Sequence, residues 1–324
     1  MRAVKKMTVV ISMAMLACAA LVVTQERALA QQKYPSKPIR IVVGVTPGGT
    51  ADIIARLMGV KISDNWGQPV VIENRLPVVV ANTTVVKANA DGYTLLLASP
   101  AIAIRAALFT NLPYDTLRDF AGVTEVGFSN TVVVVPADLG ARSIKDLIAY
   151  TNARPGKIFF ATPAVGGADH MNIERFRLAA GIKAQHVAYR GPAESLIEVA
   201  AGRAHFTATG LTAAMPFIKD GKLVALVQRV AGLPGVPLAA DVMPEWGRIG
   251  TQALLAPAGT PLAIRRQIAT EVARVLNLPD IRERLSAASF QVATNTPEEH
   301  ERNLRADIAA FAKIIKEIGL KPNY

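Results

Sequence analysis

The chain is poor in cysteine and histidine, which narrows the chemistry open to it. One cysteine, Cys18, and four histidines occur in 324 residues. Cys18 lies in the N-terminal apolar run, so the rest of the chain has no thiol for disulfides, iron–sulfur clusters or nucleophilic catalysis. His170 and His186 do not show the ligand spacing of a metal site. The sequence therefore predicts no metal and no cofactor, and both histidines are expected to be structural.

Signatures of nucleotide, nucleic-acid and hydrolytic sites are missing as well. No Gly-Lys-Ser/Thr follows a glycine turn and no G-x-G-x-x-G is present, so a nucleotide is not expected. The chain is basic, with a formal net charge of +11. It has no run of five basic residues and no basic stripe with interleaved aromatics, so no nucleic-acid partner is expected. An exported hydrolase with Ser99 as nucleophile is an alternative, but no G-x-S-x-G occurs.

The first 30 residues are typical of a secretory signal peptide. Three basic residues precede an apolar run at 7–23, and the small-x-small site Ala28-Leu29-Ala30 follows. We predict cleavage after Ala30, which leaves 32 basic and 24 acidic residues and a net charge of +8 in a mature chain that starts at Gln31. Two alternatives remain, an uncleaved membrane anchor and a lipoprotein attached through Cys18.

Apolar runs typical of strands alternate with segments of helical spacing. This alternation predicts an α/β fold with mainly parallel sheets, and about 294 mature residues suggest two lobes. Caps and first-turn prolines predict helix starts at Ser143, Pro192, Thr260-Pro261 and Thr296-Pro297, the last opening a long amphipathic helix closed by Gly319. The expected strands are residues 39–45, 69–73, 94–98, 131–135, 158–161, 186–189, 204–209, 223–228 and 252–256.

The turn Pro47-Gly48-Gly49-Thr50 joins the first of these runs to a helical segment. A strand that ends in glycines and feeds a helix brings unpaired N–H groups and the positive end of the helix dipole together, which suits an anion. Many such turns need glycine only for a positive φ and bind nothing. The spacing alone leaves both interpretations open.

Several separated motifs follow one another along the mature chain. They are Tyr34-Pro35-Ser36-Lys37-Pro38-Ile39-Arg40, Pro47-Gly48-Gly49 with Asp52 and Ala55-Arg56, Gly67-Gln68-Pro69-Val70-Val71 with Glu73-Asn74-Arg75, Asp91-Gly92-Tyr93-Thr94-Leu95-Leu96, Leu112-Pro113-Tyr114-Asp115 with Asp119-Phe120, Ala256-Pro257-Ala258-Gly259-Thr260-Pro261 and Thr296-Pro297-Glu298-Glu299. Any one of them is weak. The ordered set resembles the periplasmic substrate-binding proteins of tripartite tricarboxylate transporters, the Bug-type family.

The resemblance implies a two-lobed clamshell of the Venus-flytrap type, each lobe a mainly parallel sheet flanked by helices. Residues 31–130 and 250–324 would form lobe 1, and residues 131–249 would form lobe 2. It also implies a monomeric periplasmic receptor, not an enzyme, that binds a small organic carboxylate between the lobes. Such a receptor delivers its ligand to the large and small membrane subunits of the transporter. A membrane sensor kinase as the partner is the alternative.

In open α/β lobes, ligands bind beyond the carboxyl ends of the strands. Gly44 to Asp52 matches the family's ligand loop, residues 161–170 match a second loop before a helix, and Tyr189-Arg190-Gly191 matches the family's Tyr-Lys-Gly. Asp52 is equally well interpreted as a helix-dipole partner, and Ser99 and Arg190 as ordinary surface residues. The candidate ligand-binding residues are Gly44, Thr46, Pro47, Gly48, Gly49, Thr50, Asp52, Ser99, Thr162, Gly166, Gly167, Ala168, Tyr189, Arg190 and Thr209.

Two segments depart from the family pattern. After Asn74-Arg75 the family has a glycine-rich loop, whereas residues 76–83 contain three consecutive valines, which do not easily adopt a positive φ. A tighter, more apolar wall is expected there. Thr209 stands where the family often has an acid, which removes a partner for a ligand ammonium. Both changes favour a monocarboxylate or a slim dicarboxylate over citrate or an amino acid, and a receptor that has lost binding is the alternative.

Overall fold

The computed structural model describes residues 34–247 and 250–321. The predicted signal peptide, its cleavage after Ala30 and the alternative lipid attachment at Cys18 lie outside these residues. None of the helices in the described ranges has both the length and the apolar character that a bilayer crossing requires.

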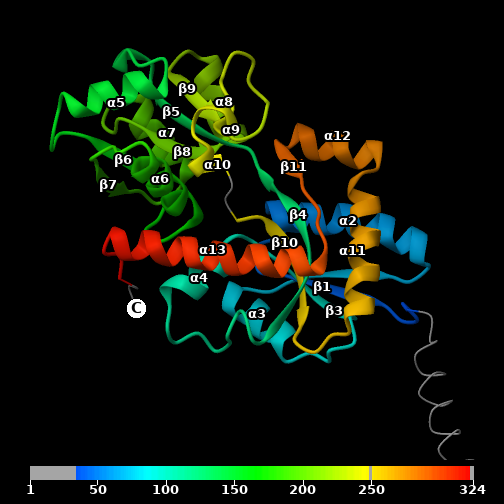
Figure 1. Cartoon of the computed structure of the whole chain (residues 1–324). Helices are drawn as coiled ribbons and strands as arrows, with labels where there is room; N and C mark the ends of the chain where they lie inside the picture. Colours follow the sequence, from blue (N-terminus) through cyan, green and yellow to red (C-terminus); the bar gives the residue numbers. More distant parts are fainter. Residues whose placement is uncertain (1–33, 248–249, 322–324) are drawn as a thin grey trace, which may run out of the picture.

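One end of the molecule is built on a six-stranded sheet in the order β11-β4-β10-β3-β1-β2, and we call this part the first lobe (Figure 1). Its strands are β1 (Ile39–Val43), β2 (Val70–Asn74), β3 (Thr94–Ala98), β4 (Phe120–Ser129), β10 (Gln252–Pro257) and β11 (Phe290–Val292). Its helices are α2 (Thr50–Trp66), α3 (Val78–Val86), α4 (Ala101–Leu108), α11 (Leu262–Leu276), α12 (Pro279–Ala287) and α13 (Pro297–Glu317).

The second lobe lies at the other end and contains a three-stranded sheet, β8-β5-β9, and the pair β6-β7. Its strands are β5 (Thr131–Pro136), β6 (Phe159–Thr162), β7 (Gln185–Ala188), β8 (Thr207–Gly210) and β9 (Leu223–Gln228). Its helices are η1 (Ala137–Leu139), α5 (Ile144–Asn152), α6 (Ala168–Ala179), α7 (Pro192–Ala200), α8 (Leu211–Lys219), α9 (Ala239–Val242) and α10 (Pro244–Gly247).

The strand pairing is more mixed than the expected mainly parallel sheets. β1 pairs in parallel with β2 and β3, and β6 pairs in parallel with β7. β10 is antiparallel to both β3 and β4, and β5 is antiparallel to β8 and β9. The reason in the first lobe is that β4 leads the chain toward the second lobe and β10 brings it back, so these neighbours run in opposite directions. The lobe boundaries near residues 130 and 250 stay a prediction.

The two strands that the sequence did not reveal are β4 and β11. β4 contains Gly122 and Gly127, which interrupt its apolar alternation, and β11 has only three residues. Both occur where other elements approach closely. A Cβ on Gly122 would lie 2.8 Å from the His300 ring, and a Cβ on Gly127 would lie 2.6 Å from the Phe290 ring. The close approach of these elements, rather than strand propensity, therefore accounts for the glycines in β4.

Three of the four predicted helix starts are confirmed. Thr296 and Glu299 form a capping box, Pro192 occupies the first turn of α7, and Ser143 accepts a hydrogen bond from the Asp146 amide at 3.1 Å. The prediction for Thr260 as a cap is wrong. Its hydroxyl instead donates to the Pro257 carbonyl at 2.7 Å, and α11 begins at Leu262 after Pro261.

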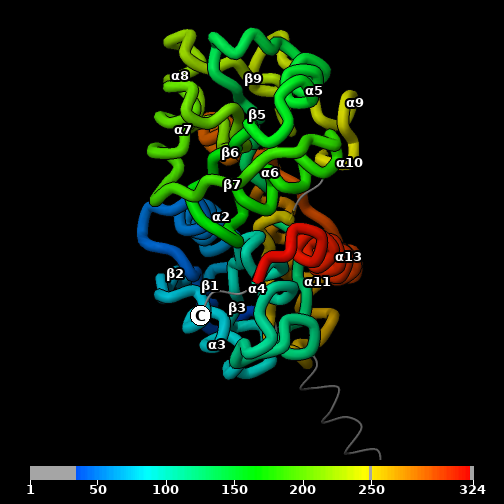
Figure 2. The backbone as a smooth tube through the Cα atoms, turned by 90° about the vertical axis from the view of Figure 1, so that its left-hand side faces the viewer, coloured from blue at the N-terminus to red at the C-terminus, as the bar shows by residue number. Residues whose placement is uncertain are grey.

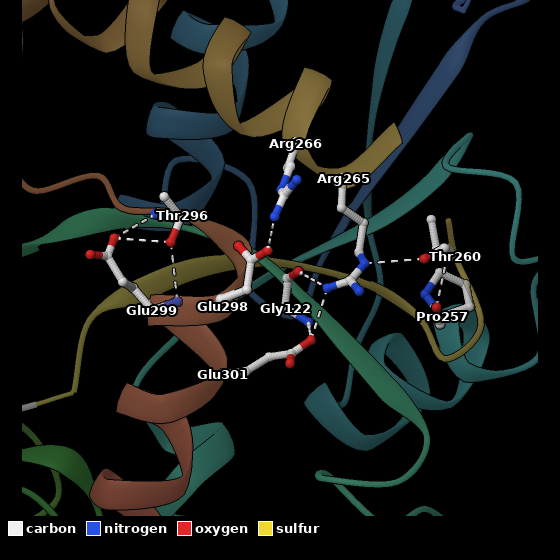
Figure 3. Close-up of polar contacts among 9 residues, drawn as sticks. All are labelled: Gly122, Pro257, Thr260, Arg265, Arg266, Thr296, Glu298, Glu299 and Glu301. Atoms are coloured by element: carbon white, nitrogen blue, oxygen red, sulfur yellow. Dashed lines mark hydrogen bonds and ion pairs between the residues drawn. The ribbon is translucent and has the colours of Figure 1, made fainter. Parts of the chain in front are cut away.

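Arg265 on α11 ties the C-terminal helices to the sheet (Figure 3). Its guanidinium donates to the Gly122 carbonyl at 2.8 Å, to Glu301 on α13 at 2.8 Å and to the Thr260 carbonyl at 3.1 Å. α13 in turn contacts both α4 and α6, and Figure 1 shows it lying along the junction of the two lobes. The C-terminal helix thus packs against both halves of the chain.

Candidate functional site

The carboxyl ends of β1, β2 and β3 lie at one edge of the first sheet because the three strands are parallel. A small pocket opens there between the β1–α2 turn, the start of α3 and the β3–α4 turn. It includes the predicted residues Gly44 and Ser99, and its volume of about 10 Å³ is close to that of one water molecule. Asn82 contributes an amide side chain to the lining. The rest of the lining is mostly apolar and includes Val45, Ala51, Val78, Leu96, Leu97, Ala98 and Ile102.

The segment 76–83 is not the loop that the sequence suggested. Pro77 is the N-cap of α3, and the three valines form the first turn of that helix. Helical residues have a negative φ, so valine fits there without the strain that a glycine-rich loop would impose on it. A Cβ added to Gly44 would lie 2.7 Å from a methyl group of Val78. The start of α3 therefore packs directly against the end of β1.

In the β1–α2 turn, the two glycine amides are occupied within the turn itself. The Gly48 amide donates to Asp52 Oδ2 at 2.9 Å and the Gly49 amide donates to the Thr46 carbonyl at 3.0 Å. Gly48 has a φ of +83°, which favours glycine. The amides that point out of the helix end are consequently those of Thr50, Ala51 and Asp52, for which the described residues supply no backbone acceptor. Thr46, Pro47 and Thr50 are exposed.

Asp52 is the centre of this turn and is only 2% exposed. Besides the Gly48 amide, its carboxylate accepts hydrogen bonds from Arg56 Nε and from Asn74 Nδ2, both at 3.0 Å. The Arg56 contact, with help from Gly48 and Asn74, lowers the pKa of Asp52 to about 2 against the opposing effect of burial. Asn74 also donates to the Val45 carbonyl at 3.0 Å. Asp52 thereby links the turn, α2 and the end of β2.

The β6–α6 turn in the second lobe has the same construction. Gly166 has a φ of +71°, Gly167 is the N-cap of α6, and the Gly166 amide donates to His170 Nδ1 at 2.9 Å. Leu108 at the end of α4 lies 3.2 Å from the position of a Cβ on Gly166. Figure 2 shows this turn reaching down from the second lobe toward α4. The turn therefore lies against the first lobe.

The remaining predicted residues all lie in the second lobe and differ in their contacts and exposure. The Thr162 hydroxyl is 2.5 Å from His186 Nε2, and Ala168 is the first residue of α6. The Tyr189 amide donates to the Thr162 carbonyl at 2.8 Å, which places the Tyr189–Gly191 loop next to the β6–α6 turn. The Arg190 amide donates to Glu194, while its side chain is exposed. Thr209 pairs with Val132 inside the β8–β5 ladder and is 5% exposed.

The structure thus groups the predicted residues into a first-lobe set and a second-lobe set. Sequence reasoning missed Asn74 as part of the first set and His170 as the partner of Gly166, whereas it did place Val78 in an apolar wall of the pocket. The position in the chain could have indicated both missed residues, because Asn74 ends a strand and His170 stands three residues after an N-cap. Among residues 34–247 and 250–321, no group of three or more histidine, cysteine or acidic side chains is placed to hold a metal ion.

Asp169, the second residue of α6, allows a test of how burial changes the pKa of a carboxyl group and the stability of the fold. Burial raises the pKa of its carboxyl to about 6, and it has no hydrogen-bond partner among the described residues. The folded state therefore holds this proton more tightly than the unfolded state, and the resulting stability is present below about pH 4 and lost as the pH rises through 6. We expect Asp169→Asn to raise the free energy of unfolding by about 1–2 kcal/mol at pH 7.5 and by almost nothing at pH 4.

Urea unfolding at the two pH values measures this difference. The matched control is Asp146→Asn in the first turn of α5, where the Arg142 amide and the Ser143 cap lower the pKa of the carboxyl. That variant should be destabilised at pH 7.5, the opposite sign. An equal response of Asp169→Asn at both pH values would show that the raised pKa is not what the substitution relieves.

Comparison with known proteins assigns the chain to a family. A family model described as the tripartite tricarboxylate transporter family receptor matches residues 54–320. The chain belongs to this receptor family. Protein BugT of Bordetella pertussis is 31% identical over 297 residues, which cover 89% of this chain and 91% of BugT. A protein encoded between tcbD and tcbE in Pseudomonas sp. strain P51 is 30% identical over 312 residues, 94% of this chain and 93% of that protein.

Solved structures agree with this assignment. Rpa4515 of R. palustris, solved with adipate, is 30% identical, and the match covers 90% of this chain and all of that one with a TM-score of 0.70. A TctC solute-binding protein from Polaromonas has a TM-score of 0.77 at 19% identity over 88% of this chain and 100% of that chain, which shows the shared fold. The periplasmic-binding-protein fold expected from the sequence is confirmed, and the chain is a substrate-binding receptor rather than an enzyme. Receptors of this family are periplasmic, bind small carboxylates and work with tripartite transporters.

Proposed function

We propose that this receptor binds a slim aliphatic dicarboxylate of about the length of adipate between its lobes. The observation that carries the proposal is the pair of matching Gly-Gly turns, one in each lobe, which open α2 and α6. A carboxylate at a helix N-terminus gains about 0.3–1 kcal/mol when exposed and up to about 2 kcal/mol when partly buried. The 30% identical relative that was solved with adipate supports the ligand class.

The lining favours a ligand with an apolar body. One carboxylate would lie between the N-termini of α2 and α6, and the methylene chain would run along the wall that contains Val78. The guanidinium of Arg190, which has no hydrogen bond or ion pair within the described ranges, is our candidate for the distal carboxylate. Contacts to both turns exist together only when the lobes are closed, so the ligand would enter an open form of the receptor and the lobes would then close on it.

We further propose that the chain is exported to the periplasm, is cleaved after Ala30, acts as a monomer and delivers its ligand to the large and small membrane subunits of a tripartite transporter. The motif order and the family assignment support this role. N-terminal sequencing of the exported protein should begin at Gln31. A sequence that begins at Met1 or at Cys18 would contradict the cleavage.

Calorimetric titration of the purified mature protein tests the ligand class. Adipate is expected to bind at least tenfold more tightly than citrate, glutamate, benzoate or hexanoate. Arg190→Gln should weaken adipate at least tenfold and leave hexanoate unchanged, because hexanoate has no distal carboxylate. Tightest binding of citrate or glutamate would refute the proposal, and so would the absence of binding to every member of the panel.

A further inference from the structure

We propose that His170 is the positioning residue of the β6–α6 turn and has there the role that Asp52 has in the β1–α2 turn. The inference rests on one part of the proposed function, namely that the two turns present backbone amides to a ligand carboxylate. His170 itself contacts the turn and not the ligand.

The two turns correspond residue by residue. Gly48 and Gly166 have a positive φ, of +83° and +71°, and each precedes a glycine N-cap. The third helical residue, Asp52 or His170, accepts a hydrogen bond from that first glycine at 2.9 Å in both lobes. In a capping box, the side chain at this position accepts from the N-cap amide. Here it reaches one residue further back and fixes the glycine that turns the chain into the helix.

The imidazole of His170 is itself held from several sides. It stacks on His186 with ring centroids 4.0 Å apart and an angle of 15°, and His186 stacks in turn on Phe160 at 5.0 Å. Since Nδ1 accepts from Gly166, the ring proton lies on Nε2, which faces Glu174 Oε1 at 3.6 Å. Glu174 also accepts from Arg177 Nε at 2.6 Å. His170 is 3% exposed and Glu174 5%, so the orientation of the ring is set by packing.

The choice of acceptor matters for an anionic ligand. In the first lobe the acceptor is a carboxylate whose charge is balanced by Arg56. In the second lobe the acceptor is the ring nitrogen Nδ1 of His170, which is neutral. The hydrogen bond that fixes Gly166 therefore brings no additional negative charge near the amides of Ala168, Asp169 and His170. Those amides, left without an intrahelical acceptor, form the second-lobe face of the carboxylate site. His170 thus fixes the donors without opposing the ligand.

Three variants test the role. His170→Phe keeps a stacking ring but removes the acceptor, and His170→Asn restores an acceptor at the position of Nδ1. His205→Phe is the matched control, because His205 Nδ1 accepts from the Phe159 amide at 3.1 Å elsewhere in the same lobe. We expect His170→Phe to weaken adipate binding about tenfold, His170→Asn to remain within about threefold of the unmodified protein, and His205→Phe to bind normally.

Amide NMR of the ligand-free proteins separates this inference from the proposed function. His170→Phe should shift the Gly166 amide signal and speed hydrogen exchange at Gly166, while His170→Asn and His205→Phe should not. If the unmodified protein binds no carboxylate, the proposed function fails, and the amide signals still decide whether His170 holds the turn. An unchanged Gly166 signal in His170→Phe, or equal affinity of all three variants, would overturn the inference.

Discussion

Replacing Asp52 with alanine is expected to lower the free energy of unfolding by about 3 kcal/mol and to weaken carboxylate binding at least tenfold. The buried carboxylate accepts hydrogen bonds from Gly48, Arg56 and Asn74. Removing it leaves the Gly48 amide without its acceptor, takes one of two acceptors from the Asn74 amide, and leaves Arg56 with only its bond to Asn74. The turn that opens α2 then loses the contact that fixes it, and the amides of Thr50 and Ala51 are no longer held where we propose that they meet the ligand carboxylate.

The pH dependence of this effect has a definite sign. The pKa of Asp52 in the folded protein is lowered to about 2, mainly by Arg56, from an ordinary value of 3.8. The stabilisation by its carboxylate is therefore complete above about pH 4 and is lost as the pH falls toward 2. The difference in stability between the unmodified protein and Asp52→Asn should be full at pH 7 and should shrink below pH 4.

Asp64→Ala is the matched control for both measurements. Asp64 lies on the same helix but is exposed, in the last turn, where an acid is unfavourable for the helix dipole. This variant should have unchanged or slightly increased stability and normal affinity. If Asp52→Ala unfolded at the same urea concentration as Asp64→Ala, the three hydrogen bonds to Asp52 would not matter for the stability of the turn.

Much of the fold follows from local patterns in the sequence. β3 and β9 have the bounds that were expected, because continuous apolar runs bounded by polar residues are typical of buried strands. The capping box at Thr296 is likewise a local signal. β4 has no such signal, since its glycines are required by His300 and Phe290, which are far away in sequence. Contacts of this kind depend on the tertiary arrangement and cannot be read from a window of the chain.

The candidate site, too, has features that local sequence patterns reveal and features that depend on the tertiary structure. The Gly-Gly turns were recognisable because strand, glycine and helix follow one another directly. That the glycine amides are occupied by Asp52 and His170 depends on side-chain rotamers, and the sequence left Asp52 open between a dipole partner and a ligand contact. His170 was expected to be structural. The structure gives that expectation a specific partner, the Gly166 amide.

Gly127→Ala is expected to lower the free energy of unfolding by more than about 4 kcal/mol. Gly127 has a φ of +145°, and a Cβ there would overlap the Gln291 carbonyl oxygen and lie 2.6 Å from the Phe290 ring. The new methyl group would meet backbone on one side, which cannot rotate away. β11 would have to separate from β4. This separation would expose Phe290, which is buried in the first-lobe core, and would break its pairing with Ser129 at the end of β4.

Gly140→Ala separates the steric effect from the backbone effect. Gly140 also has a positive φ, +79°, but no atom lies within 4 Å of its hypothetical Cβ. Its substitution should cost only about 1–2 kcal/mol, the price of a left-handed conformation in a non-glycine residue. Urea unfolding of the two variants measures the difference. Equal losses would mean that the contacts of the Gly127 Cβ with Gln291 and Phe290 add nothing to the cost of a positive φ, whereas a much larger loss at Gly127 is the result expected when β11 packs against this position.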